Sequence, residues 1–193
     1  MDYAATLKKN LEASITAKQT LLLDKETQAT FTRAIAKVVE SYRNGGRLYI
    51  AGNGGSAADA QHLAAEFVSK LARERAPLPA EALTVDSSIL TAIGNDYGYD
   101  QVFARQLKGK LTSKDVFLGI TTSGNSPNII NALNTCRNLR VPTIVLSGHD
   151  GGKVRHLTDY LIIAPGNMTS TIQELHIVIE HSLCECVENE IFN

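Results

Sequence analysis

Hydrophobic positions change their spacing at the glycine pair of residues 45–46. Before this pair they recur at helical intervals, and Leu7, Leu11 and Ile15 lie four residues apart. The spacing predicts two helices, which Asp24 separates. We expect the second helix to end at the glycine pair, where a left-handed helix cap costs little.

Beyond the glycine pair, short apolar runs alternate with longer helical segments. Strands separated by helices need crossover connections, which produce a parallel sheet with helices on both faces. We therefore expect one α/β domain over residues 1–193, with a doubly wound, parallel five-stranded sheet and residues 1–46 as an N-terminal helical extension. The expected strands are residues 47–51, 82–85, 116–121, 143–146 and 160–164, and the expected helices are residues 57–71, 88–94, 127–139 and 171–190.

Composition and charge narrow the class of protein. Hydrophobic residues make up 44% and charged residues 20% of the chain, as in globular domains. The formal net charge of −1 gives no general attraction to nucleic acid or to an anionic membrane, so we expect neither as a partner. The three cysteines show no metal or disulfide spacing, and no signal peptide or membrane span is evident, so we expect a cytoplasmic protein.

A glycine-rich segment follows the first predicted strand, at the position where open parallel sheets bind ligands. It reads Gly52-Asn53-Gly54-Gly55-Ser56, and we expect Ser56 to cap the helix that comes next. Its backbone N–H groups can bind a phosphate or a polar sugar group. A simple turn that begins a helix explains the same residues.

A hydroxyl-rich segment follows the third predicted strand and ends at Pro127, a residue typical of the first helical position. Hydroxyls and free backbone N–H groups at a helix start suit a phosphate, and they explain how a chain of nearly zero net charge can hold an anion. The alternative is that the hydroxyls only cap the helix. The hydroxyl side chains are those of Thr121, Thr122, Ser123 and Ser126.

Asn95 and Asp96 lie between these two segments, after a short predicted helix. Their side chains can bind sugar hydroxyls, although both residue types also favour turns. His149 and His156 lie in and after another glycine-rich loop, and we expect both at the surface.

Two pairs of side chains on predicted helices suggest a metal site. His62 and Glu66 are four residues apart, and Gln173 and His181 are eight apart, so each pair shares a helix face; His176 lies off that line. Together the two pairs form a plausible four-ligand set for a divalent metal such as zinc. The alternatives are a solvated helix face for the first pair and an ordinary core or surface histidine for the second.

Four motifs make the chain similar to the bacterial phosphoheptose isomerases of the sugar isomerase (SIS) superfamily. They are GNGGSAADAQH at 52–62, AIGNDYGY at 92–99, TSGNS at 122–126 and IQELH at 172–176. The resemblance implies a SIS-type, flavodoxin-like fold and a cytoplasmic homotetramer with one zinc ion per subunit. It also implies conversion of D-sedoheptulose 7-phosphate to D-glycero-D-manno-heptose 7-phosphate, the first step of ADP- or GDP-heptose synthesis for lipopolysaccharide or capsule.

The resemblance also implies roles for individual residues. Glu66 would be the base at carbon and His181 the acid at oxygen, the pair that an aldose-ketose isomerase needs. Lys70 and Thr171 depart from the family pattern, because relatives frequently have arginine there. The implied zinc ligands are His62, Glu66, Gln173 and His181, and the implied substrate contacts are Asn53, Gly54, Gly55, Ser56, Glu66, Asn95, Asp96, Thr121, Thr122, Ser123, Ser126 and Gln173.

Two alternatives to an isomerase share the expected fold. A non-catalytic SIS protein that binds a bacterial replication initiator would lack an acid/base pair, whereas Glu66 and His181 are both present here. A regulator that senses sugar phosphates would need a helix-turn-helix with a basic face, and residues 1–46 contain no such basic helix.

Overall fold

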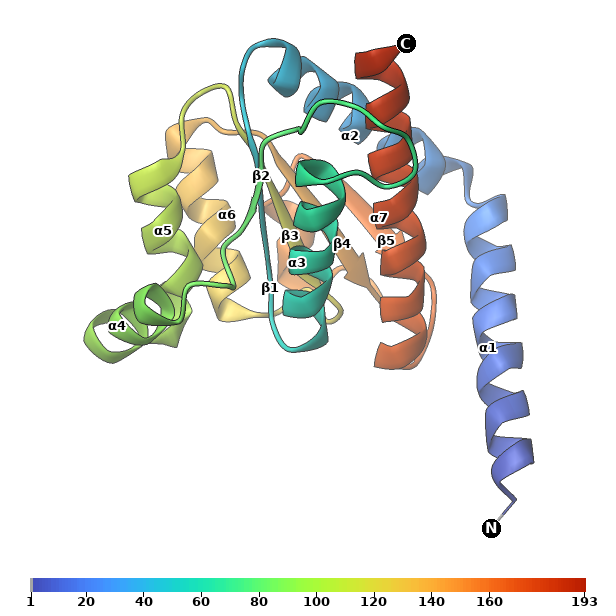
Figure 1. Ribbon diagram of the computed structural model, residues 1–193. Coiled ribbons are helices and arrows are strands. Elements are labelled where there is room, and N and C mark those ends of the chain that lie inside the picture. The colour runs from blue at the N-terminus through green and yellow to red at the C-terminus, as the bar shows by residue number, and fades with distance from the viewer. Residues whose placement is uncertain (1) are drawn as a thin grey trace.

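The computed structural model describes residues 2–193, in which a parallel five-stranded sheet lies between helices on both faces (Figure 1). The strand order β2-β1-β3-β4-β5 is that of a doubly wound, flavodoxin-like sheet, which confirms the predicted fold class. The strands are β1 (Leu48–Gly52), β2 (Ala80–Ala82), β3 (Val116–Thr121), β4 (Thr143–Gly148) and β5 (Tyr160–Ala164).

Alternate residues of each strand pack against different helices, as the period of two in a strand requires. Leu48 and Ile50 of β1 belong to the core beneath α2 (Lys25–Arg43), α3 (Gly55–Val68) and α7 (Thr169–Phe192). Tyr49 and Ala51 face the opposite core. The helices of that second layer are α4 (Ser87–Tyr97), α5 (Val102–Lys110) and α6 (Pro127–Leu139).

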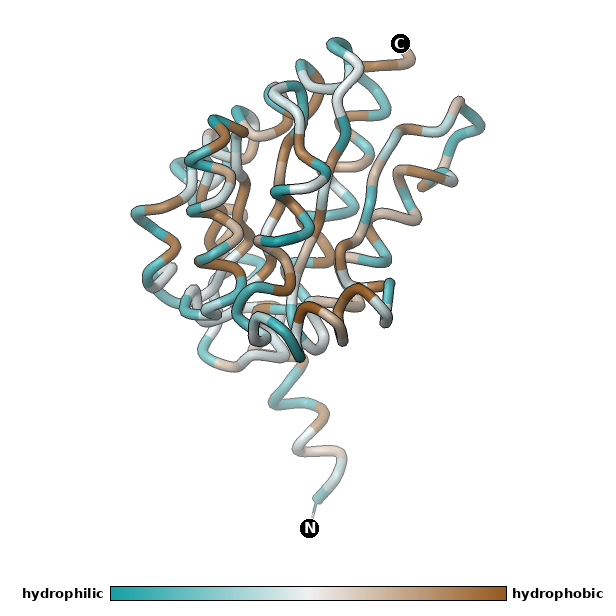
Figure 2. The backbone as a smooth tube through the Cα atoms, turned by 90° about the vertical axis from the view of Figure 1, so that its left-hand side faces the viewer, coloured by the Kyte–Doolittle hydropathy of each residue, from teal (hydrophilic) through white to brown (hydrophobic). Residues whose placement is uncertain are grey.

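The first helix, α1 (Tyr3–Leu23), packs against α7 only through its C-terminal half. Its N-terminal half stands away from the rest of the molecule in both views (Figures 1 and 2). Leu7, Leu11 and Ile15 are 62%, 54% and 54% exposed, so the predicted apolar stripe is not covered within one chain. Among residues 2–193, no helix combines the length and the apolar character needed to cross a membrane.

The predicted division of the N-terminal region is confirmed. The Asp24 carboxylate accepts a hydrogen bond from the Thr27 backbone N–H at 3.0 Å, so Asp24 caps α2 at its start. After α2 the chain turns at Gly45, where φ is +75° and glycine is favoured.

Four predictions about single elements were wrong. The helix predicted at 57–71 ends at Val68. The second strand is Ala80–Ala82 rather than 82–85, because this edge strand pairs only with β1 and the chain leaves the sheet before the exposed Val85. The fourth helix continues to Tyr97 instead of ending at residue 94, so Asn95 and Asp96 are helical. The helix α5 was not predicted, because the polar residue Gln106 interrupts the apolar pattern of its buried face.

Candidate active site

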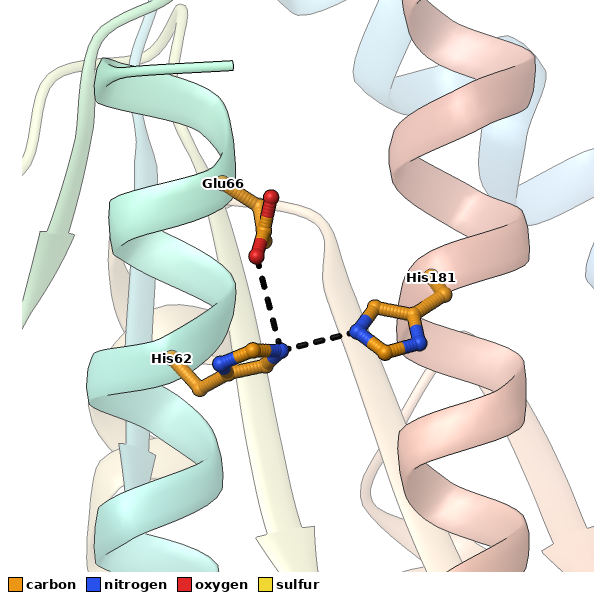
Figure 3. Close-up of side chains that lie close together, drawn as sticks. All are labelled: His62, Glu66 and His181. Atoms are coloured by element: carbon orange, nitrogen blue, oxygen red, sulfur yellow. Dashed lines mark hydrogen bonds and ion pairs between the residues drawn. The ribbon is translucent and has the colours of Figure 1, made fainter. Parts of the chain in front are cut away.

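Three side chains with metal-binding or acid/base chemistry converge between α3 and α7. His62 and Glu66 come from α3 and His181 comes from α7, and their ligand atoms all lie within 4.8 Å of one another (Figure 3). The Nε2 atom of His62 is 2.8 Å from Nε2 of His181 and 3.6 Å from Oε1 of Glu66. The i, i+4 spacing places the first two on one helix face, and the sheet places α7 beside that face.

The chemistry of this cluster fits a divalent cation. Two imidazole nitrogens and a carboxylate oxygen that face a common point are a typical partial ligand set for zinc. The side chain of His62 is 43% exposed and that of Glu66 is 18% exposed, so solvent and small molecules can reach the cluster. The three side chains therefore fit a His/Glu/His metal site formed by two helices.

Gln173, the fourth predicted ligand, lies in the second turn of α7 and contacts a different part of α3. Its side chain packs against Gly55, where a Cβ atom would lie only 2.4 Å from the Gln173 Nε2 atom. Within residues 2–193 no hydrogen bond joins Gln173 to the cluster. The structure thus brings three of the four predicted ligands together, and the metal-binding role of Gln173 stays a prediction.

The glycine-rich segment after β1 forms the turn that begins α3. Gly54 is the residue that precedes the helix, with φ +56° and ψ −121°, a conformation that favours glycine. The prediction that Ser56 caps this helix was wrong: Ser56 lies inside the first turn, buried against Gly52. Gly54 and Gly55 are exposed, and their predicted contacts with substrate stay predictions.

The hydroxyl-rich segment after β3 also precedes a helix start. Ser126 is the residue before α6 and Pro127 is its first residue, which confirms the predicted start of this helix. The Ser126 side chain makes no capping hydrogen bond; its hydroxyl lies 3.1 Å from the Thr121 hydroxyl instead. The segment is thus not explained by capping alone, and Thr122 and the exposed Ser123 complete the predicted phosphate site.

Asn95 and Asp96 form the exposed last turn of α4. The Asn95 side-chain amide donates a hydrogen bond to the Asp96 carboxylate at 2.8 Å. Three residues later, the Tyr99 hydroxyl donates a hydrogen bond to Oδ1 of Asn53 at 3.2 Å, so this segment contacts the glycine-rich turn. Asn95 and Asp96 remain predicted substrate contacts.

Two carboxyl groups on α3 and α7 were not predicted from the sequence. Glu180 is fully buried, and within residues 2–193 neither of its carboxyl oxygens has a hydrogen-bond partner; the same holds for Oδ2 of Asp59. Burial, and to a smaller extent the neighbouring Asp59 carboxylate, raises the pKa of Glu180 to about 9. Glu180 is therefore protonated at neutral pH and adds no negative charge beside His181.

A buried ion pair also joins the two helices and was not predicted. Arg75 and Glu188 lie 2.6 Å apart with side chains 1% and 3% exposed. The Arg75 guanidinium also donates hydrogen bonds to the backbone carbonyls of Glu66 and Phe67, at 2.8 and 2.7 Å, near the end of α3. Arg75 thus ties the end of α3 that carries Glu66 to α7.

One signal in the sequence was available for Glu180 and none for Arg75. Glu180 lies one turn from the buried residues His176 and Leu183, so it is a carboxyl group within an apolar stripe. Arg75 lies in a segment without regular structure, where no periodicity indicates burial.

The remaining predicted positions are distributed over the surface and the core. His149 and His156 are exposed, as expected. Lys70 is exposed and pairs with Glu74, whereas Thr171 is buried in the first turn of α7.

Comparison with known proteins identifies the family. A family model described as SIS domain matches residues 12–148. A curated phosphoheptose isomerase of Aneurinibacillus thermoaerophilus is 49% identical over 186 residues, which cover 96% of this chain and 94% of that protein. The chain belongs to the phosphoheptose isomerase family.

Solved structures of this family agree closely with the fold. A phosphoheptose isomerase from Neisseria gonorrhoeae is 39% identical with a TM-score of 0.91, over 97% of this chain and 100% of that one. Another from Francisella tularensis is 34% identical with a TM-score of 0.93, over 98% and 100%. The chain is therefore an enzyme, an isomerase of heptose phosphate metabolism, and the non-catalytic alternative is not favoured.

Proposed function

We propose that the enzyme interconverts D-sedoheptulose 7-phosphate and D-glycero-D-manno-heptose 7-phosphate, the first step of ADP- or GDP-heptose synthesis. The observation that carries this proposal is the convergence of His62, Glu66 and His181 within 4.8 Å. An aldose-ketose isomerase moves a proton between two neighbouring carbons, which requires a base, an acid and stabilisation of negative charge on oxygen. The cluster offers candidates for all three roles, and they lie close enough together to act on one carbonyl group and the carbon next to it.

The position of the cluster along α3 suits a long sugar phosphate. Gly55 begins α3 and His62 lies seven residues later, a rise of roughly 10 Å along the helix axis. A substrate with its phosphate at the helix starts can therefore extend its reacting carbons along α3 toward the cluster. In this arrangement Gln173, beside Gly55, contacts the phosphate end of the substrate.

Glu66 is the proposed base at carbon and His181 the proposed acid at oxygen. The two residues come from different helices, so they can act on different sides of the same carbonyl group. Only Oε1 of Glu66 faces His62, at 3.6 Å, and within residues 2–193 its carboxylate has no hydrogen-bond partner. A carboxylate free of strong hydrogen bonds is able to turn toward a substrate carbon and accept its proton.

The proposed cofactor is one zinc ion per subunit, which His62, Glu66 and His181 would hold. Gln173, the predicted fourth ligand, would have to turn from Gly55 toward the cluster to reach the ion. When bound there, zinc would polarise the sugar carbonyl and stabilise the negative charge that develops on its oxygen. While bound to zinc, the Glu66 carboxylate would be a weaker base, so we propose that it would accept the proton only when it is not a ligand.

We further propose that the enzyme works as a homotetramer in the cytoplasm. Support for an oligomer comes from α1, whose exposed Leu7, Leu11 and Ile15 must be covered by another chain if they are to leave water. An apolar groove between α1, α2 and α7, lined by Leu22, Phe31 and other apolar residues, lies next to this stripe.

The proposed cytoplasmic location is supported by the three cysteines, all of which are free thiols.

Incubation of the purified protein with sedoheptulose 7-phosphate tests the proposed activity. Proton NMR should detect the aldoheptose product, chelation of the metal should abolish its formation, and added zinc should restore it. Absence of product in every metal condition would contradict the assignment of this substrate.

A further inference from the structure

Asn53 and Asn128 form a reciprocal pair of side-chain amides beneath the predicted substrate loops. The Asn53 amide nitrogen donates to Oδ1 of Asn128 at 2.9 Å, and the Asn128 amide nitrogen donates to Oδ1 of Asn53 at 2.8 Å. Asn128 is only 2% exposed, and its Oδ1 also accepts a hydrogen bond from the Ile129 backbone N–H. Because Asn128 is buried, an alternative position of its side chain would leave these hydrogen bonds unmade, so the pair holds Asn53 firmly.

The pair joins the three segments that are predicted to hold the substrate. Asn53 belongs to the glycine-rich turn, and Asn128 lies two residues after Ser126, in the first turn of α6. From the third segment, the Tyr99 hydroxyl donates to Oδ1 of Asn53 at 3.2 Å, three residues after Asp96. The three segments are far apart in the sequence, and the Asn53 side chain is where they meet.

These hydrogen bonds leave little of the Asn53 side chain for a ligand. Its Oδ1 atom accepts from both Asn128 and Tyr99, which uses both lone pairs, and only one amide hydrogen remains free. The side chain therefore acts mainly within the protein. The exposed backbone of Gly54 and Gly55, which follows directly, is the part of the turn that can face a sugar phosphate.

We propose that Asn128 is a positioning residue for the substrate, which acts through Asn53. Its amide holds Asn53, and thereby the backbone of Gly54 and Gly55, at a fixed position relative to the hydroxyl-rich loop that begins α6. This inference rests on the proposed function, because it assigns both loops to the binding of one sugar phosphate.

The main test is the Asn128→Ala variant, with Asn134→Ala as the matched control. Asn134 lies on the same helix and is exposed, and within residues 2–193 its side chain makes no hydrogen bond. Asn128→Ala should raise KM for sedoheptulose 7-phosphate about tenfold or more and lower kcat much less, since the acid/base residues lie elsewhere. The zinc content of both variants should stay at the wild-type level, and so should the activity of Asn134→Ala.

A double-mutant cycle separates positioning from general stability. If Asn128 acts through Asn53, adding Asn128→Ala to Asn53→Ala should change KM by less than about twofold. If the increase in KM of the double variant equals the product of the increases in the two single variants, the inference is overturned. An unchanged KM in a folded Asn128→Ala variant would overturn it as well. Should that variant fail to fold, Tyr99→Phe at an exposed position removes one bond to Asn53 and should still raise KM.

Binding of inorganic phosphate, measured by calorimetry, makes this test independent of turnover. The affinity should fall about tenfold in Asn128→Ala and stay unchanged in Asn134→Ala. A wild-type protein that binds phosphate but does not convert sedoheptulose 7-phosphate would contradict the proposed function only. Equal phosphate affinity in wild type and Asn128→Ala would contradict the positioning role only.

Discussion

Among the three clustered side chains, His62 is the most open to solvent. Its side chain is 43% exposed, compared with 18% for Glu66, while its Nε2 atom points at both partners (Figure 3). An imidazole in this position can bind a metal at the mouth of the site without closing access to it. The more shielded Glu66 is better suited to proton transfer, because shielding from water strengthens its interactions with substrate.

Replacement of His62 should therefore affect the metal first. In His62→Ala we expect the affinity for zinc to fall by about tenfold or more, because one of the nitrogen ligands is lost. Metal analysis after dialysis against a weak chelator measures this change. His156→Ala is the matched control, since His156 is an exposed histidine outside the cluster. Wild-type zinc content in His62→Ala would remove the proposed site.

Spacing along helices predicted the cluster but not the residues that support it. The intervals between His62 and Glu66 and between Gln173 and His181 placed each pair on one helix face, and the structure brings three of these side chains together. Asn128 was missed because its role depends on a contact with a residue 75 positions away in the chain. Periodicity carries no information about such contacts.

At the scale of elements, α3 and α7 must keep their relative position for the cluster to exist. The buried Arg75–Glu188 pair joins them, and Arg75 also binds backbone carbonyls at the end of α3. Removal of one partner of a buried ion pair leaves the other charge buried and unpaired.

Arg75→Met should lower the free energy of unfolding by about 3–5 kcal/mol. It should also weaken zinc binding, since α3 loses a connection to α7 close to Glu66. Urea denaturation at a fixed protein concentration measures the first effect. Arg73→Met, which removes an exposed arginine of the same loop, should change stability little. Equal stabilities of the two variants would contradict the role of the buried pair.

A second element-scale prediction concerns His176 on α7. Burial lowers its pKa to about 4 from the ordinary value of 6.5, and its Nε2 atom contacts the Ser147 carbonyl at 3.1 Å. Below pH 6.5 the unfolded chain binds a proton at His176 that the folded chain does not bind. The contribution of His176 to stability is therefore complete above pH 6.5 and is lost as the pH falls toward 4.

His176→Gln keeps a hydrogen-bond donor and removes this titration. The difference in unfolding free energy between wild type and variant should fall by about 1 kcal/mol from pH 7 to pH 5.5. Thermal or urea unfolding at both pH values, with the two proteins compared at each, measures it. A difference that does not depend on pH would show that His176 binds its proton equally in both states.

For the whole molecule, the alternation of apolar runs and helical segments was sufficient to predict the sheet. Four of the five strands were located to within two residues. The central strands β1, β3 and β4 are buried throughout, and the edge strand β5 still contains a continuous apolar run. The edge strand β2 was displaced, because it is only three residues long, contains Glu81 and follows a segment without regular structure. The order of the strands did not follow from the sequence pattern and came from the structure.

The uncovered stripe on α1 leads to a prediction about assembly. Light scattering should give the wild-type protein a mass of about four times 20.9 kDa. Leu11→Glu places a charge within the apolar stripe and should shift the protein to smaller species, whereas Lys9→Glu, outside the stripe, should not. A wild-type monomer at micromolar concentration would contradict the proposed packing of α1 between subunits.

The account depends most on proton transfer by Glu66, and exchange with heavy water measures it directly. In D2O the wild-type enzyme should introduce deuterium at the reacting carbon of the heptose phosphate, as detected by NMR. Glu66→Gln should bind the substrate with similar affinity but lower both this exchange and kcat by about a hundredfold or more. Exchange at the wild-type rate in Glu66→Gln would contradict the assignment of Glu66 as the base.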